Sequence, residues 1–399
     1  MNSLVPDGWK QLEVRDAFDL GRGRVISKPE IRDNPGVYPV YSSQSKNNGK
    51  MGSLGSFDFD GEYITWTTDG AYAGTVFHRK GRFNCTNVCG TLKDKGAHQI
   101  HPRFVARYLE TVAKNHVSYV GNPKLMNGTF AEIIFLLPPL PEQQKIADIL
   151  TSVDNVIETT QAQIDKLKDL KTGMMQELLT KGIGHSEFKD SPVGRIPVGW
   201  EVKPLEAVVE NVIDCEHKTA PYVERSDYLV VRTNNVRSGV LLYNDMKFTT
   251  KSGFDEWTTR AVPLPGNILF TREAPAGESC MVPSGVKVCL GQRMVLLKSN
   301  FAEITGAYLS LYLNSDIAKL LIYELSIGTT VSRINIQDIK KINCIVPQLK
   351  EQKSIVDAVE SVQMTIARKE RKLKSIVSSK KALMQDLLTG TIRVKVDSK

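Results

Sequence analysis

The chain has 399 residues, of which 41% are hydrophobic and 24% are charged, a composition typical of a folded protein with two or three domains. Lysine and arginine number 52 against 44 aspartates and glutamates, and the formal charge of +8 favours an anionic partner without demanding one. The sequence has no apolar run long enough to cross a bilayer, no signal-peptide pattern and only six dispersed cysteines. We therefore expect a cytoplasmic protein with free thiols and no membrane contact.

A duplication organises the sequence. Glu142-Gln143 recurs as Glu351-Gln352, 209 positions later, and 142–183 aligns with 351–392 without a gap, with 14 of 42 positions identical. Earlier segments repeat at smaller offsets, namely Val5–Trp9 with Ile196–Trp200, Tyr38–Gly49 with Tyr228–Gly239, and Cys85 with Cys289. The matched segments follow one another in the same order in both copies, which indicates one duplicated unit. The larger offsets after the first segments place about 15 extra residues of the second copy within 240–265.

Each copy has two unlike parts. The first part alternates short β-branched and aromatic runs with Gly, Asn and Pro, as in Gly61–Gly70, which predicts a mixed, strand-rich domain. The second part is a long amphipathic helix without internal proline. The predicted organisation is a domain at 1–141, a long helix at 142–181, a linker at 182–191, a second domain at 192–350, a second long helix at 351–390 and a tail at 391–399.

Both long helices carry apolar residues at heptad spacing over about five heptads, or roughly 57 Å. Such a helix needs a partner, and its own duplicate is available, so we expect the two to pair antiparallel about a pseudo-twofold axis. Polar residues at four heptad positions, Thr160, Lys171, Lys369 and Lys380, either extend from the edge of the seam or fix its registry. The predicted seam residues are Ile146, Leu150, Val153, Ile157, Ile164, Leu167, Met174 and Leu178 in the first helix and Ile355, Val359, Val362, Ile366, Leu373, Ile376, Leu383 and Leu387 in the second.

The predicted fold class is therefore α+β, with two homologous mixed α/β domains separated by two long antiparallel coiled-coil helices in a pseudo-twofold internal repeat.

Known catalytic motifs are missing from the sequence. It has no P-loop, no Gly-x-Gly-x-x-Gly, no His-Glu-x-x-His and no Gly-x-Ser-x-Gly. A zinc site at Cys85, Cys89, His98 and His101 is disfavoured because the cysteine spacing is unusual and the second copy keeps only Cys289. We expect a binding protein with no catalytic residue, metal or cofactor of its own.

Polar loops at equivalent places in the two copies are the candidates for binding nucleic acid. Asn and Gln pair bidentately with adenine and Arg with guanine, and Gly-rich basic turns suit phosphate. The alternative for any one Asn or Ser is that it only shapes a turn, whereas Trp9 and Trp66 are expected in the core. The candidate residues are Ser42, Ser43, Gln44, Lys46, Asn47, Asn48, Thr67, Thr68, Asn122 and Lys124 in the first copy and Arg232, Thr233, Asn234, Asn235, Arg237, Arg272, Thr329, Thr330 and Arg333 in the second.

Several of these segments resemble the specificity subunit of type I restriction-modification systems. Leu137–Ala147 and Val346–Gln352, which open the long helices, look like the helical regions of that family. Tyr63–Phe77 and Gly266–Glu273 look like parts of its target recognition domains, and Gly199-Trp200 resembles the usual start of the second one. The resemblance extends over essentially the whole chain.

The resemblance implies a non-catalytic subunit whose two domains each recognise one half of a bipartite, asymmetric site in double-stranded DNA. Its paired helices would set the spacer and dock two adenine-methylating subunits that bring S-adenosylmethionine, followed by ATP- and Mg-dependent motor-nuclease subunits. A bacterial or archaeal cytoplasm is then expected. The alternative is a coiled-coil adaptor that joins proteins without recognising bases.

Overall fold

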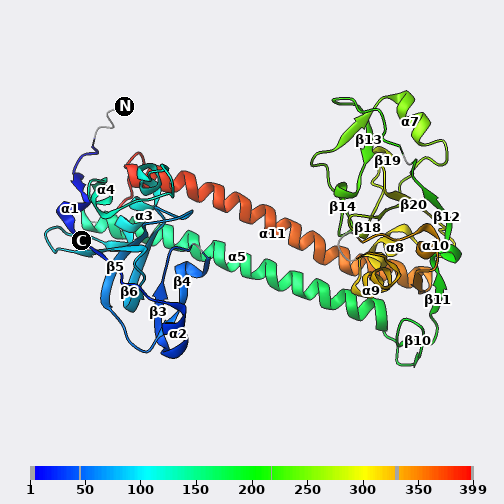
Figure 1. Ribbon diagram of the computed structural model, residues 1–399, viewed down its shortest axis with the longest axis horizontal. Coiled ribbons are helices and arrows are strands. Elements are labelled where there is room, and N and C mark those ends of the chain that lie inside the picture. Colours follow the sequence, from blue (N-terminus) through cyan, green and yellow to red (C-terminus); the bar gives the residue numbers. More distant parts are fainter. Residues whose placement is uncertain (1–4, 45, 217, 329–331, 397–399) are drawn as a thin grey trace. The chain divides into compact units, whose positions relative to one another are not determined.

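The computed structural model describes residues 5–44, 46–216, 218–328 and 332–396. The chain divides into two compact units, the first formed by Met1–Gln161 with Arg371–Lys399 and the second by Ala162–Glu370 (Figure 1). Each unit contains one mixed α/β domain and a segment of both long helices. Among the described helices, none combines the length and the apolarity needed to span a membrane.

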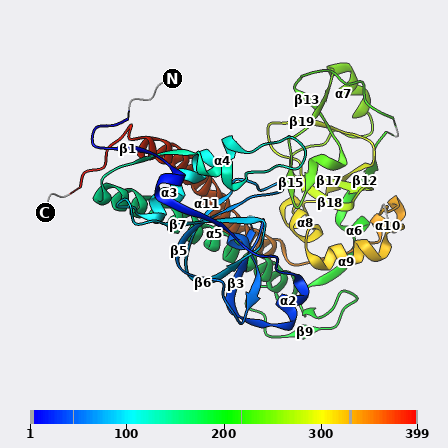
Figure 2. The ribbon, with the colours of Figure 1, turned by 60° about the vertical axis from the view of Figure 1, so that its left-hand side comes forward.

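The first unit is built on a sheet of six strands in the order β2-β7-β5-β6-β3-β4, of which β7, β5, β6 and β3 are labelled in Figure 2. All neighbours are antiparallel except β3 and β6. A core that includes Trp66, Phe104 and Phe135 lies between this sheet and α3. The elements are β1 (Lys10–Glu13), α1 (Val14–Ala17), β2 (Phe18–Arg22), α2 (Lys28–Asp33), β3 (Pro35–Tyr41), η1 (Lys46–Gly49), β4 (Lys50–Leu54), β5 (Phe59–Thr67), β6 (Val76–Cys85), β7 (Cys89–Asp94), α3 (Pro102–Val112), η2 (Ala113–His116), α4 (Asn127–Ala131), β8 (Ile134–Leu137) and α5 (Leu140–Lys181).

The second unit repeats this topology in two smaller sheets. The order β12-β20-β17-β18 matches β2-β7-β5-β6, and the parallel pair β13 and β19 matches β3 and β6. The extra residues predicted in 240–265 include α7, which has no counterpart between β4 and β5. The elements are β9 (Phe188–Lys189), β10 (Ile196–Pro197), β11 (Glu201–Pro204), α6 (Leu205–Val208), β12 (Val209–Asp214), β13 (Tyr228–Val231), η3 (Thr233–Asn235), β14 (Val236–Arg237), β15 (Val240–Leu241), β16 (Lys247–Thr249), α7 (Lys251–Trp257), β17 (Ile268–Arg272), β18 (Ala276–Met281), β19 (Lys287–Leu290), β20 (Met294–Ser299), α8 (Gly306–Leu313), α9 (Asp316–Leu325), α10 (Ile336–Lys340), β21 (Asn343–Val346) and α11 (Leu349–Thr389).

Both long helices begin two residues before the predicted starts. The turn that precedes Glu142 is already helical, because proline is tolerated in the first turn of a helix, where its missing N–H would have no partner. Pro141 occupies that turn of α5. The second helix likewise begins at Leu349, and it ends at Thr389.

The repeated Glu-Gln pair anchors the start of each long helix to its domain. In the first unit the Trp9 indole N–H donates to Glu142 (3.1 Å), and in the second the Trp200 indole N–H donates to Glu351 (2.9 Å). Trp9 and Trp200 are both buried. The two Glu side chains are held again by residues that follow a long helix, Arg393 on Glu142 (2.7 Å) and His185 on Glu351 (2.8 Å). Arg393, which follows α11, therefore ties this part of the chain to the first domain.

The glutamine of each pair makes a matching set of buried hydrogen bonds. Gln143 accepts from the His101 N–H (2.7 Å) and donates to the carbonyls of Gln99 (2.9 Å) and Pro138 (2.7 Å). Gln352 makes the same three bonds with Thr305, Glu303 and Pro347, at 2.8, 2.9 and 2.9 Å. His101 and Thr305 are the residues before α3 and α8, so each glutamine joins the segment that precedes this helix to the residues just before its own long helix.

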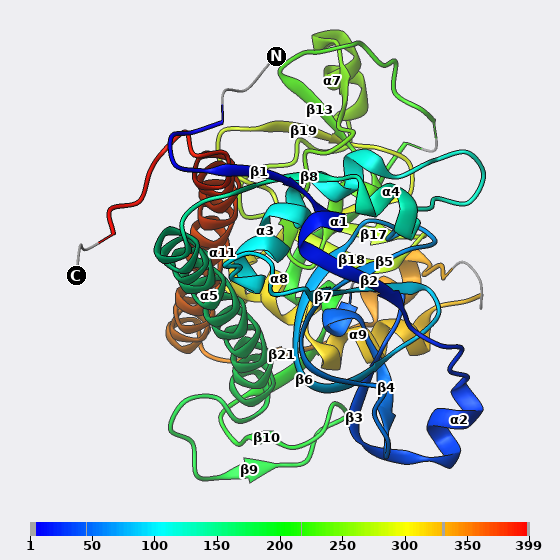
Figure 3. The same cartoon turned by 90° about the vertical axis from the view of Figure 1, so that its left-hand side faces the viewer.

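Within each unit the two helix segments run antiparallel. In the first unit Lys380 pairs with Asp154 (2.6 Å), and the end of α11 lies beside the start of α5 (Figure 3). In the second unit Lys171 donates to Gln363 (2.6 Å) and Lys369 to Gln163 (2.8 Å). Three of the four polar seam residues therefore have partners on the facing helix, while the hydroxyl of buried Thr160 donates to the Val156 carbonyl (2.7 Å) of its own helix.

All sixteen predicted seam residues lie on the less exposed side of their helices. They are either buried or half-buried, and the fully or almost fully buried members are Ile146, Leu150, Ile164, Ile355, Val359, Ile366 and Leu387. The remaining nine are half-buried. We retain this face as the proposed helix seam.

The cysteines supply a test of the packing. All six are buried and free, and burial raises the pKa of the Cys280 and Cys289 thiols to about 12. Because the thiolate is the reactive form, we expect these two to react with iodoacetamide at pH 8 roughly a thousandfold more slowly than in the unfolded chain. Peptide mapping of labelled native and denatured protein measures the ratio, and comparable rates would contradict the packing of β18 and β19.

Candidate nucleic-acid interface

In the first unit a short hairpin at 118–124 is bonded to the end of β5. The Thr68 N–H donates to the Val88 carbonyl (2.9 Å), and the Thr68 carbonyl accepts from Leu125 N–H (2.8 Å). Lys124 forms bridges both to Asp69 and to Ser118 across the hairpin. The exposed Lys124 side chain is therefore held beside the end of the strand by backbone hydrogen bonds.

Arg22, at the end of β2, links the neighbouring loops. Its guanidinium donates to Thr68 Oγ1 (3.2 Å), to Asp69 (3.2 Å) and to the carbonyl of Asn87 (2.5 Å). These bonds join the ends of three strands that lie far apart in the sequence.

The loop after β3 meets the same place. The Thr86 N–H donates to the Tyr41 carbonyl (2.9 Å), and its hydroxyl donates to Ser42 Oγ (3.1 Å). We call the group formed by Arg22, Ser42, Thr68, Asp69, Asn87 and Lys124 the first polar surface.

The candidates of the first copy differ in their exposure. Thr67 and Thr68 are fully buried, and the Thr68 hydroxyl donates to Asp69 (2.6 Å). These two threonines thus lie beneath the exposed residues of the first polar surface and support them. Ser42, Ser43 and Gln44 are half-buried, whereas Asn47, Asn48, Asn122 and Lys124 are exposed; the side chain of Lys46 lies outside the described part of the chain.

The loop at 42–49 has a backbone that few residues adopt. Asn47 and Asn48 have φ of 49° and 52°, in the left-handed region that asparagine tolerates better than most side chains. The amide of Gln44 donates to the carbonyl of Lys50 across the loop. Part of this asparagine-rich composition is therefore explained by turn geometry.

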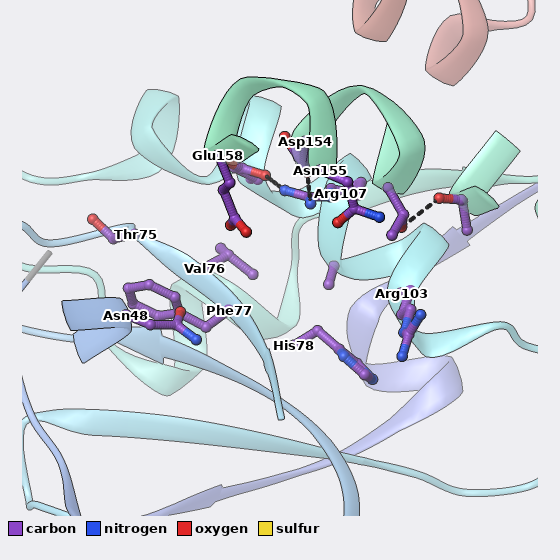
Figure 4. A pocket seen from close by; sticks show the side chains of 14 residues that line it. Asn48, Thr75, Val76, Phe77, His78, Arg103, Arg107, Asp154, Asn155 and Glu158 are labelled. Carbon is purple, nitrogen blue, oxygen red and sulfur yellow. Dashed lines mark hydrogen bonds and ion pairs between the residues drawn. The ribbon is translucent and has the colours of Figure 1, made fainter. Parts of the chain in front are cut away.

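A cleft of about 710 Å³ separates this loop from α3 and α5 (Figure 4). Asn48 lies at one side of it near Phe77, and Glu158 of α5 lies opposite. Arg107 projects from α3 and pairs with Asp154 of α5 and with Glu110 (3.0 Å). Asn48 thus lines a charged cleft that faces the long helix.

Arg79 of β6 supports the loop from inside and was not among the predicted residues. It is only 3% exposed, and its guanidinium lies 3.5 Å from the ring centroid of Tyr41 and 4.4 Å from that of Phe77. Burial lowers the pKa of Arg79. A Cβ on Gly49 would lie 3.1 Å from this guanidinium, so Arg79 occupies the space directly beneath the loop.

In the second unit the same backbone pairing recurs at the end of β17. The Arg272 N–H donates to the Arg293 carbonyl (3.0 Å), and the Arg272 carbonyl accepts from Ile334 N–H (2.9 Å). Arg333 forms bridges to Glu273 and to Ile327. These bonds match those of Thr68 and Lys124, so Arg272, Glu273, Arg293 and Arg333 occupy the positions of Thr68, Asp69, Val88 and Lys124.

The structure brings together Arg272 and Arg333, which the sequence offered as separate candidates. With Glu273, Gln292 and Arg293 they line a hollow of about 260 Å³, which we call the second polar surface. Gln292 and Arg293 were missed, because the turn that carries them has no Asn-rich or Gly-rich basic pattern. Its Gly291 was the available signal: a Cβ there would lie 2.8 Å from the Val231 carbonyl, so that position requires glycine.

The loop after β13 divides into supporting and exposed residues. Asn235 is fully buried; its amide donates to the carbonyls of Leu242 and Asn244 (both 3.1 Å) and its oxygen accepts from Arg232 N–H (3.1 Å). Arg232 donates to Asp245 (2.8 Å), which lowers the pKa of that carboxyl. Thr233 is half-buried and Asn234 and Arg237 are exposed, whereas Thr329 and Thr330 lie outside the described residues.

Comparison with known proteins agrees with a duplicated chain. The family model described as the type I restriction modification DNA specificity domain matches residues 6–169 and 197–377. A putative type I specificity subunit of Mycoplasma pneumoniae is 51% identical over 142 residues, which cover 35% of this chain and 75% of that protein.

Two further relatives match almost the full length. The specificity subunit of the type I restriction enzyme MjaVIII of Methanocaldococcus jannaschii is 28% identical over 98% of this chain and 94% of that protein. The crystal structure of a type I restriction-modification S subunit from M. genitalium superposes with a TM-score of 0.60 at 14% identity, over 97% of both chains. At that identity the structural match supports the fold.

Proposed function

Because this chain belongs to the type I restriction modification DNA specificity domain family, we propose that each of its two units recognises one half of a bipartite, asymmetric site in double-stranded DNA. Its role is that of a DNA sequence-specificity subunit, which is non-catalytic within a methyltransferase and nuclease complex. Beyond this role, we propose that each unit recognises its own half-site.

One observation supports the assignment of a different half-site to each unit. The paired segments at the ends of β5 and β17 have the same backbone bonds but different side chains. The first has Thr68, Val88 and Lys124, and the second has Arg272, Arg293 and Arg333. A duplicated scaffold whose equivalent surfaces differ in hydrogen-bonding groups suits two different half-sites, since base edges are distinguished by donor and acceptor pattern.

We propose as DNA contacts candidate residues whose side chains are exposed or half-buried. In the first unit we propose Ser42, Ser43, Gln44, Asn47, Asn48, Asn122 and Lys124, and in the second Thr233, Asn234, Arg237 and Arg333. The buried Thr67, Thr68, Asn235 and Arg272, and Arg232 with its carboxylate partner, are proposed to hold these loops in place.

We also propose the partners. The long helices would dock two methylation subunits that bring S-adenosylmethionine, and motor-nuclease subunits that use ATP and Mg would join that assembly. The chain itself would act without a cofactor, in the cytoplasm of a bacterium or archaeon.

Base-resolved mapping of methylated adenines tests the proposed function. The chain is expressed with its methylation subunits in a host free of other adenine methylation, and a bipartite asymmetric consensus is expected. A complex that methylates without sequence preference would instead support a protein-joining adaptor. Methylation or cleavage by the purified chain alone would also contradict the proposal.

The proposed role of the helices in setting the spacer yields its own prediction. One heptad is inserted into both helices, after Ala162 and after Arg371, which are equivalent positions of the repeat. Seven residues add about 10 Å of helix while preserving the seam face, so the spacer is expected to lengthen by about three base pairs. Methylome mapping should show unchanged half-sites, and an unchanged spacer would refute the role.

A further inference from the structure

The second polar surface is a concave site in which arginine predominates. Arg272, Arg293 and Arg333 share the hollow of about 260 Å³ with Glu273 and Gln292. Arg272 is 8% exposed and its guanidinium lies 2.6 Å from Asp214, so its charge is neutralised within the fold. Arg293, Arg333 and Gln292 remain as the exposed groups of the hollow.

The backbone holds Arg293 in a defined position. Its carbonyl accepts from the Arg272 N–H (3.0 Å), and its φ of 68° lies in the left-handed region, which non-glycine residues seldom adopt. The Gly291 N–H donates to the Val231 carbonyl (2.8 Å) two residues earlier. These hydrogen bonds join the turn to β13 and β17 and fix the backbone that carries the Arg293 side chain.

The charges at the hollow favour a neutral ligand over a phosphate. Glu273 lies 3.5 Å from Arg293 Nε and is half-buried. This carboxylate would repel a phosphate group, but it leaves the outer guanidinium nitrogens of Arg293 available. A planar guanidinium pairs bidentately with the O6 and N7 acceptors of guanine in the major groove.

We propose that Arg293, positioned by the turn at 291–293, recognises a guanine in the half-site bound by the second unit. This inference rests on the proposed function and adds the base. The first unit has Val88 at the equivalent position, as the matching bonds from Thr68 and Arg272 show. The guanine contact therefore belongs to the second half-site.

The test uses the chain in complex with its methylation subunits and duplexes carrying the mapped site. Each guanine of the second half-site is replaced in turn by 7-deazaguanine, which lacks N7, or by hypoxanthine, which keeps both N7 and O6. At one position 7-deazaguanine is expected to weaken binding by about ten- to a hundredfold, while hypoxanthine binds normally. Arg293→Ala should remove this difference, and Arg293→Lys should retain part of it.

Lys287→Ala is the matched control, because this exposed cation lies at the other end of β19 from the hollow. It should leave the 7-deazaguanine effect intact. A uniform loss of affinity in Arg293→Ala on every duplex, with a salt dependence reduced by about one ion, would show a phosphate contact and overturn the inference. So would a 7-deazaguanine effect that survives in Arg293→Ala.

Failure of the proposed function has a different signature. A wild-type complex that binds the mapped site and a scrambled duplex equally would overturn the proposed function and this inference with it. A wild-type complex that prefers the mapped site but is indifferent to 7-deazaguanine at every position would overturn only the inference.

Discussion

Gln143→Ala is expected to destabilise the first unit by about 3 kcal/mol. Gln143 is fully buried, and its loss leaves the His101 N–H and the carbonyls of Gln99 and Pro138 without their partners. Each unsatisfied buried group costs about 1–3 kcal/mol. Hydrogen exchange followed by mass spectrometry should show amides of the first unit exchanging about a hundredfold faster.

The chain offers matched controls for this substitution. Gln144 is exposed and its amide bonds only to Asp148 (3.1 Å), so Gln144→Ala should change little. Gln352→Ala should transfer the effect to the second unit, because its three bonds repeat those of Gln143. Equal exchange in Gln143→Ala and Gln144→Ala would refute the anchoring role.

Exchanging residues 42–48 for other polar residues is expected to alter recognition of one half-site and leave the other intact. The loop leaves the sheet at Tyr41, over Arg79, and its side chains are half-buried or exposed where they are described. Each lost base contact costs about 1–3 kcal/mol, a ten- to hundredfold change in preference. Adenine methylome mapping of the wild-type and exchanged chains measures this directly.

The second half-site serves as the internal control in the same molecule. Exchange of Thr233 and Asn234, which occupy the equivalent loop, should produce the reciprocal result. A change in both half-sites, or in neither, would contradict the assignment of one half-site to each unit.

The repeated Glu-Gln pair shows which features could be predicted from the sequence. The 209-residue offset located two copies and two helix starts, because duplicated segments preserve their order. The function of the pair was not visible, since Glu142 meets Trp9 and Arg393 only when the start of the first domain and the residues after α11 come together. Contacts between residues so far apart have no local pattern.

The candidate interface shows the same limit. Polar loops after equivalent strands were found from composition, but composition does not separate Asn235, whose amide is used inside its own turn, from exposed Asn234. Arg293 was not found from composition, because only the fold brings it beside Arg272 and Arg333. Arg79 was missed because one charged residue in a strand is usually solvated.

The sequence by itself determined the duplication, the mixed domains, the two amphipathic helices and the family, because periodicity and repeated motifs are written locally along the chain. Tertiary structure decided which polar residues support the loops and which are exposed. Whether a polar side chain is buried and hydrogen-bonded depends on segments that come together from distant positions in the sequence. The tertiary structure therefore shows that the loop candidates form two equivalent surfaces with different side chains.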